Sequence, residues 1–246
     1  MATPRSTRRC ATTGHRSRVV LTCFAAAGAD LWACVRTRKP EFSAYLDALQ
    51  EEHGVQITEL HLDLSQPDQV KAAATHILKT KKSIDVLVNN AGLIYTAPFL
   101  MSSMEKLREQ FEVNLFGPLA FTQYIARTML RQRAGSIINI SSSASIEGNP
   151  GRSAYASAKA ALNTATRVMA RELGGAGVRV NAIAPGLTQT EMMASSTSEQ
   201  AVAETLARMS LQRIAEPNEI AAAALFFASE LSSYVTGQVL CVDGGL

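Results

Sequence analysis

Short apolar runs alternate along this chain with longer stretches in which apolar residues recur at helical spacing. The runs are typical of buried parallel strands, and the longer stretches are typical of amphipathic helices. This alternation predicts an α/β fold in which helices cover both faces of a parallel, doubly wound sheet. The predicted strands are Leu31–Val35, Val55–Leu62, Ile84–Val88, Ser136–Ile140, Arg179–Ile183 and Gln238–Val242. The predicted helices are Val19–Gly28, Phe42–His53, Pro67–Thr80, Ser102–Arg131, Ser153–Leu173 and Glu216–Leu231.

Residues 1–17 do not follow this pattern. They show no apolar strand pattern, so we expect them to be poorly ordered or only loosely laid at the sheet. We therefore treat residues 1–17 as an atypical N-terminal segment and residues 18–246 as one domain. A chain of 246 residues with 47% apolar residues is sufficient for a large α/β domain with its own core.

Composition and charge exclude several classes of partner. The longest apolar runs are too short to cross a membrane, so no membrane association is predicted. Residues 1–29 hold five arginines and no acid, which leaves 19 basic and 21 acidic residues in the rest of the chain. The net charge of +3 therefore comes from the N-terminus, and no nucleic-acid partner is predicted.

The cysteines and histidines do not indicate a metal site or a disulfide framework. No Cys-x-x-Cys motif occurs, and scattered cysteines are typical of a protein of the reducing cytoplasm. His53, His61 and His76 lie in helix or strand patterns and do not form a metal-binding set. The four cysteines are Cys10, Cys23, Cys34 and Cys241.

Tyr155 and Lys159 are the first candidates for chemistry. They lie four residues apart in a predicted helix, so their side chains share one face. An ammonium held beside a phenol favours the phenolate and lowers the pKa of the tyrosine. Such a tyrosine can exchange protons with an alcohol or a carbonyl oxygen near neutral pH.

Three further polar motifs follow or lie near predicted strands. Ser142 follows the strand that ends at Ile140, and Asn89–Gly92 follows Ile84–Val88. In an open α/β sheet, ligand chemistry takes place at these carboxyl ends of strands. The small residues of the second motif let a flat ligand lie against the backbone. Asn114 lies in the long amphipathic stretch between the two strands.

These motifs occur together with Pro185-Gly186 and Val242–Gly245, in an order and spacing that resemble the classical short-chain dehydrogenases/reductases. The resemblance is greatest to the 3-oxoacyl-[acyl-carrier-protein] reductase type and covers roughly residues 18–246. It implies a single-domain Rossmann fold and an enzyme that reduces a carbonyl to a hydroxyl by hydride transfer.

The resemblance implies a catalytic role for four residues. Tyr155 would donate the proton to the carbonyl oxygen, and Ser142 would hydrogen-bond that oxygen and orient it. Lys159 would lower the pKa of Tyr155 and bind the nicotinamide ribose. Asn114 would kink its helix and hold a water molecule that completes the proton relay.

The resemblance also implies a nicotinamide cofactor. Members that prefer NAD have an acid at the end of the second strand, where this chain has Val35 followed by Arg36. A guanidinium suits a 2′-phosphate, so NADP is predicted rather than NAD. Asp63 would contact the adenine, although an aspartate after a strand is also an ordinary capping or turn residue. The predicted cofactor residues are Arg36, Asp63, Leu64, Asn90, Ala91, Gly92, Tyr155, Lys159, Pro185, Gly186, Thr188 and Thr190.

The glycine-rich loop that should bind the cofactor pyrophosphate is abnormal. A gap-free alignment places Ala11, His15 and Ser17 where the family has three glycines, and residues 4–9 where it has the first strand. A shifted alignment uses Thr13-Gly14 as the first pair but needs a deletion in the following helix. The resemblance therefore predicts an abnormal first strand and an incomplete phosphate site.

A frame shift is one explanation for this abnormality. Residues 14–18, Gly-His-Arg-Ser-Arg, can be encoded by codons that read Gly-Ile-Gly-Arg one base later, and this matches the family at positions 15–18. The N-terminus would then be frame-shifted or mis-assembled. A targeting peptide is the rival interpretation, but Val19–Gly28 already fits the first helix of the fold.

Residues 187–212 are polar and lie where the family has its mobile substrate lid. The resemblance predicts a 3-oxoacyl thioester as the substrate, either as a small molecule or linked to an acyl carrier. A sugar, a steroid or a small alcohol is the alternative. Relatives in this family form tetramers through the helices that correspond to Ser102–Arg131 and Ser153–Leu173, so the resemblance implies a homotetramer. Apolar residues on more than one face of these helices agree with it: Phe111, Leu115, Phe121, Ile125, Ala156, Ala160, Leu162 and Val168. A protein of the same fold that cannot bind its nucleotide is the alternative to an active enzyme.

Overall fold

A computed structural model describes residues 8–13 and 18–246, and in this part of the chain seven strands form one parallel sheet. The strands are β1 Arg9–Thr13, β2 Asp30–Val35, β3 Ile57–His61, β4 Val86–Asn89, β5 Gly135–Ile140, β6 Val178–Pro185 and β7 Val239–Val242. Their spatial order is β3-β2-β1-β4-β5-β6-β7, which is the doubly wound arrangement of a Rossmann fold. The predicted fold class is confirmed.

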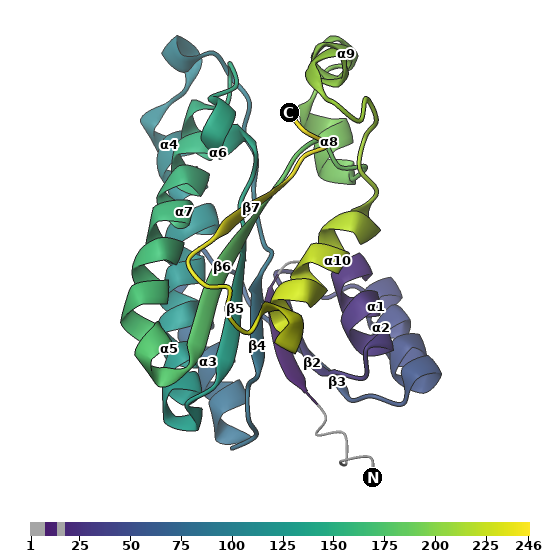
Figure 1. Ribbon diagram of the computed structural model, residues 1–246, viewed down its shortest axis with the longest axis vertical. Coiled ribbons are helices and arrows are strands. Elements are labelled where there is room, and N and C mark those ends of the chain that lie inside the picture. The colour runs from purple at the N-terminus through teal and green to yellow at the C-terminus, as the bar shows by residue number, and fades with distance from the viewer. Residues whose placement is uncertain (1–7, 14–17) are drawn as a thin grey trace.

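Helices cover both faces of this sheet (Figure 1). One apolar core lies under α1, α2 and α10 and includes Phe42 and Phe227. A second core lies under α3, α5 and α7 and includes Ile77 and Phe121. The longer helices are α1 Arg18–Ala26, α2 Pro40–His53, α3 Pro67–Lys79, α4 Met104–Phe111, α5 Gly117–Gln132, α7 Ser153–Leu173, α9 Glu199–Arg208 and α10 Pro217–Ala228. The short helices are α6 Ala144–Glu147 and α8 Glu191–Ser196.

The long helical region predicted over Ser102–Arg131 is interrupted. A π-helical segment, Glu112–Phe116, separates α4 from α5. At the start of α5 the backbone passes very close to the chain after β3, because a Cβ on Gly117 would lie 2.3 Å from the carbonyl oxygen of Leu64. Only glycine fits there. π-Helical turns are frequent at functional sites, and this one contains Asn114.

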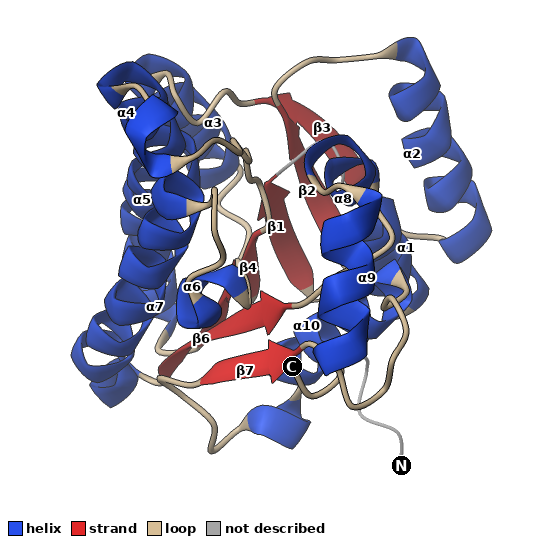
Figure 2. Cartoon of the chain, turned by 90° about the horizontal axis from the view of Figure 1, so that it is seen from above, coloured by secondary structure: helices blue, strands red, loops and turns tan. Residues whose placement is uncertain are grey.

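Residues 187–212 form two short helices rather than a second domain. Thr190 caps α8 by accepting a hydrogen bond from the Met193 N–H at 3.2 Å. Ser198 caps α9 in the same way, by accepting a hydrogen bond from the Ala201 N–H at 3.2 Å. Both helices lie over one end of the sheet (Figure 2). Their movement as a lid stays a prediction.

The structure corrects the prediction for the N-terminal segment. Residues 9–13 are neither poorly ordered nor loosely laid: they form β1, an inner strand of the sheet, paired with β2 and with β4. Cys10 and Ala11 are completely buried. Both faces of this inner strand are covered, so small side chains fill the space and β1 needs no run of large apolar residues. Its backbone hydrogen bonds come from two neighbouring strands.

This correction decides between the two alignments. The gap-free one is wrong, because it places the first strand at residues 4–9 and a loop glycine at Ala11, which lies in the middle of β1. In the shifted alignment the first pair begins at Thr13, the last residue of β1, so the glycine-rich loop would start where this strand ends. The predicted glycine positions His15 and Ser17, and most of the proposed frame shift, lie outside the described residues.

The inner position of β1 gives a first testable prediction. Ala11→Asp places a carboxylate where no water reaches, so it should lower the free energy of unfolding by about 3 kcal/mol or more. Ala72→Asp makes the same change at an exposed position of α3 and should alter it by less than about 0.5 kcal/mol. Urea unfolding of both variants checks this; equal stability of the two would show that β1 is not part of the core.

Candidate active site

The predicted catalytic residues meet at the carboxyl end of the sheet. Ser142 follows β5, Tyr155 and Lys159 lie on the first turns of α7, and Asn114 lies in the π-helical segment. Three different elements therefore supply the four side chains. Figure 2 shows this end of the sheet, with α6 and α9 in front of it.

Tyr155 and Lys159 lie on the buried face of α7, as their spacing predicts. Their exposed fractions are 8% and 3%. The Ser142 side chain lies near enough to the Tyr155 phenol to act on its pKa. The Lys159 ammonium lies 5.9 Å from the centre of the Tyr155 ring and donates to the carbonyl oxygen of Ile140 at 2.7 Å. The structure thus brings together the serine, the tyrosine and the lysine.

The pKa of Tyr155 differs from the prediction made for the Tyr155–Lys159 pair. Burial raises the pKa of Tyr155, while the Ser142 side chain and the charge of Arg152 oppose this increase. The predicted lowering of this pKa by Lys159 is therefore wrong for this arrangement, in which the ammonium faces a backbone carbonyl. Burial also lowers the pKa of Lys159 to about 8, because a charged group is costly to hold out of water.

Asn114 holds the chain that follows β4. Its side-chain amide donates to the carbonyl oxygen of Leu93 at 2.8 Å and accepts from the Leu93 N–H at 3.0 Å. A Cβ on Gly92 would lie 3.3 Å from Asn114 Oδ1 and 3.7 Å from Lys159 Nζ. Asn114 therefore positions Gly92 beside Lys159, and the absence of a side chain there keeps space near the ammonium. The water relay predicted for Asn114 stays a prediction.

A buried polar layer that the sequence did not reveal supports this arrangement. Asn89 Nδ2 donates to Thr122 Oγ1 and to Asn139 Oδ1, both at 2.8 Å. Asn139 Nδ2 donates to Thr166 Oγ1 at 2.8 Å. These bonds join α5, β4, β5 and α7 below the catalytic groups. The signal was available as asparagines inside otherwise apolar strands, since buried polar groups are normally hydrogen-bonded.

Thr13 joins β1 to the predicted cofactor loop. Its hydroxyl accepts hydrogen bonds from the N–H groups of Asn90 and Ala91 at 3.2 and 3.3 Å. The shifted alignment, which begins with Thr13, therefore agrees with a contact between the two motifs. No pattern in the sequence predicted this role for Thr13.

The carboxyl ends of β2 and β3 contain the predicted adenosine-binding residues. Arg36 is exposed directly after β2. Asp63 Oδ1 accepts from the N–H and the hydroxyl of Ser65 at 2.9 and 2.7 Å, which is the turn role considered for it. Leu64 is buried. An exposed cation and a partly exposed carboxylate at this edge fit the phosphate and adenine ends of a dinucleotide.

The remaining predicted residues lie between β6 and α8. Pro185 ends β6, and a Cβ on Gly186 would lie 2.8 Å from Asp243 Cα, so the chain after β6 packs against the C-terminal motif. The Thr188 hydroxyl donates to Gly186 O at 3.2 Å, and Thr190 caps α8. Their role at the nicotinamide end of the predicted cofactor stays a prediction.

Two properties concern the described residues as a whole. Residues 8–13 and 18–246 contain no cluster of three or more His, Cys, Asp or Glu side chains that could hold a metal ion. No described helix is long and apolar enough to cross a membrane.

Comparisons with known proteins agree with this geometry. A family model described as enoyl-(acyl carrier protein) reductase matches residues 18–246. The 3-oxoacyl-[acyl-carrier-protein] reductase FabG of Thermotoga maritima is 42% identical over 185 residues, which are 75% of each chain. A 3α-hydroxysteroid dehydrogenase of Mediterraneibacter gnavus is 36% identical over 89% of this chain and 86% of its own.

A solved structure from Beutenbergia cavernae is similar along almost the whole chain. It is assigned to an NAD(P)-dependent gluconate 5-dehydrogenase and holds NADP at low occupancy. The TM-score is 0.90 at 34% identity, with 97% of this chain and 96% of that chain covered. The likeness thus includes the N-terminal strand that the family model leaves out.

The buried ammonium of Lys159 makes stability depend on pH. Its pKa is about 8 in the folded chain and 10.5 ordinarily, so the unfolded chain binds more protons between these values. Stability contributed by this group should therefore increase as pH rises from about 8 to 10.5, by up to about 3 kcal/mol. Urea unfolding of the wild type and of Lys159→Met at several pH values isolates this contribution, because the titration of all other groups is the same in both proteins. If the two curves of unfolding free energy against pH run parallel, the prediction is wrong.

Proposed function

The chain belongs to the short-chain dehydrogenase/reductase family, and we propose that it is an NADP-dependent reductase that converts a carbonyl group to a hydroxyl group. The observation that supports this most strongly is the buried cluster of Ser142, Tyr155 and Lys159 at the carboxyl end of the sheet. The family membership supports an oxidoreductase, and the cluster supports the proton-transfer half of the reaction.

In this proposal Tyr155 is the proton donor. A raised pKa keeps the phenol protonated, as reduction of a carbonyl requires. Ser142 acts on the phenol, so a carbonyl oxygen that accepts hydrogen bonds from both hydroxyls is held in one orientation. A bound nicotinamide cofactor supplies the hydride to the carbonyl carbon.

Lys159 and Asn114 act through the groups that they hold. The ammonium, charged below about pH 8, lies near Gly92 and is available to the ribose of a cofactor that passes there. Asn114 fixes the backbone of Leu93 and so keeps this passage open. Proton return to Tyr155 by way of Lys159 belongs to the same proposal.

The choice of NADP rests on Arg36. It is exposed at the end of β2, and no acid occupies the end of this strand. A guanidinium there pairs with a 2′-phosphate by charged hydrogen bonds. The bound NADP of the Beutenbergia cavernae relative supports this choice.

A 3-oxoacyl thioester is the substrate that we favour. The FabG relatives are named for reduction of 3-oxoacyl groups on an acyl carrier protein. A steroid or a sugar acid is the alternative, because relatives named for these substrates are also similar to this chain. The lid, Tyr95 and residues 143–152 would set the choice.

A second candidate function is a protein of this fold that does not bind its nucleotide. It is favoured by the sequence between β1 and α1, where Gly14 is followed by residues with side chains. A pyrophosphate needs close contact with backbone N–H groups, which side chains obstruct.

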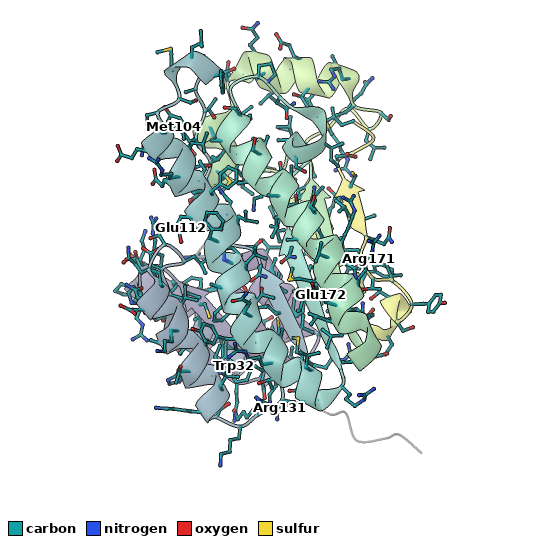
Figure 3. All side chains as sticks on the ribbon, turned by 90° about the vertical axis from the view of Figure 1, so that its left-hand side faces the viewer. Trp32, Met104, Glu112, Arg131, Arg171 and Glu172 are labelled. Atoms are coloured by element: carbon teal, nitrogen blue, oxygen red, sulfur yellow. The ribbon has the colours of Figure 1, made fainter. Side chains whose placement is uncertain are left out.

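We also propose a cytoplasmic homotetramer. The described cysteines form no disulfide, as is usual in the cytoplasm. Several residues cited for the tetramer, among them Phe121, Ile125 and Leu162, are instead buried within the chain. Phe116, in the π-helical segment, and Val168, on α7, do remain exposed, at 52% and 48%. Figure 3 shows the face of the molecule that α4, α5 and α7 form. These exposed apolar side chains support an interface there.

The role of Tyr155 is tested by removing its hydroxyl. Tyr155→Phe keeps the ring packing and should lower kcat for carbonyl reduction by a factor of about 100 or more. Tyr124→Phe, on α5, is the matched control and should leave kcat within about twofold. Steady-state rates of NADPH oxidation measure both, and the assigned role is wrong if Tyr155→Phe keeps more than about a tenth of the wild-type rate.

Cofactor binding is tested by fluorescence titration with NADPH and NADH. Arg36→Asp should weaken NADPH binding by about 10- to 100-fold and NADH binding much less, since charged hydrogen bonds contribute about 1.5–3 kcal/mol. Lys71→Asp makes the same change of charge at an exposed position of α3 and is the control. An unchanged preference would show that Arg36 faces solvent. No saturable NADPH binding by the wild type would favour the second candidate function.

A further inference from the structure

Arg152 is not used in the proposed reaction, although it lies next to the reacting groups. It immediately precedes α7 and is three residues before Tyr155. Its charge acts on the Tyr155 phenol. Its Nη2 donates to the carbonyl oxygen of Ser196 at 2.8 Å and to Thr197 Oγ1 at 3.0 Å. The guanidinium thus lies between the proton donor and the predicted lid.

The charge of Arg152 lacks an anionic partner. No carboxylate of the described residues forms an ion pair with it; the nearby Glu147 pairs with Arg208. Nη1 is buried and makes no hydrogen bond. Burial lowers the pKa of Arg152, but a guanidinium remains charged at neutral pH. A half-buried charge with free donors is costly unless an anion pairs with it.

Resting on the proposed reductase function, we infer that Arg152 is a specificity-determining residue that pairs with a carboxylate of the substrate. The substrate class is then an oxo acid whose carboxylate lies a few bonds from the reducible carbonyl, which is close to the sugar-acid alternative; a 3-oxoacyl thioester, which the names of the relatives favour, lacks this carboxylate. Arg152 holds the carboxylate through Nη1, while Ser142 and Tyr155 hold the carbonyl oxygen. A planar guanidinium suits a carboxylate, because its N–H groups match the two oxygens.

The lid takes part in this recognition. Nη1 has no exposed surface and Nη2 is bonded to residues 196–197, so the substrate reaches the guanidinium after this segment moves. The substrate carboxylate then binds Nη1, and the lid returns to Nη2. The redox step is unchanged: the cofactor gives a hydride to the carbonyl carbon, and Tyr155 gives a proton to the oxygen.

Two probes test the inference, and they differ in this charge and in one ethyl group. Acetoacetate has a carboxylate beside its 3-oxo group, and ethyl acetoacetate has a neutral ester. In the wild type, kcat/KM should be higher for acetoacetate. Arg152→Gln should lower the ratio of the two kcat/KM values by about 10- to 100-fold, and Arg152→Lys should lower it less. Thr197→Val removes one lid contact but keeps the charge, so it should leave the ratio unchanged.

Calorimetry of acetoacetate binding separates this inference from the proposed function. Binding that is lost in Arg152→Gln supports the inference even if neither probe is reduced, and that combination rejects the reductase function. Reduction of both probes with the same ratio in wild type and Arg152→Gln overturns the inference and leaves the reductase function intact. A wild-type preference for the ester overturns it as well.

Discussion

The site depends on the burial of one cation. Lys159 is almost completely buried and has no carboxylate partner among the described residues; its ammonium instead donates to the carbonyl oxygen of Ile140 at 2.7 Å. This bond joins the first turns of α7 to the end of β5, where the chain continues to Ser142. Because a buried charge without a counter-ion is costly, the surrounding fold must be rigid enough to hold it. The layer of Asn89 and Asn139 below it provides that rigidity.

Much of the fold could be predicted from the sequence, because most strands are apolar runs and most helices are amphipathic. β1 could not. Its residues are small or polar, and its stability comes from pairing with β2 and β4 and from cover on both faces. Such a strand is recognised by where it lies in the sheet, which local sequence does not show. The π-helical segment at Asn114 is similar, since it depends on the close approach of Gly117 to Leu64.

The catalytic residues were predictable because their chemistry requires particular side chains at fixed spacing. Their electrostatics were not. Spacing placed Lys159 beside Tyr155, but the distance of 5.9 Å to the ring and the bond to Ile140 appear only in three dimensions. Arg152 lies in the range 143–152 that was expected to set substrate choice, but the sequence does not single it out: its partners, Ser196 and Thr197, are more than forty residues away in the sequence.

The structure also shows which parts of the abnormal N-terminus take their place in the fold. β1 ends at Thr13 and the described part of α1 begins at Arg18, while residues 14–17 lie outside the described residues. Thr13 already binds the backbone of Asn90 and Ala91, which places the end of β1 beside the predicted cofactor loop. The first strand and the first helix of the fold are thus both in place. Whether the protein binds NADP therefore depends on four residues, and not on an N-terminus that fails to fold.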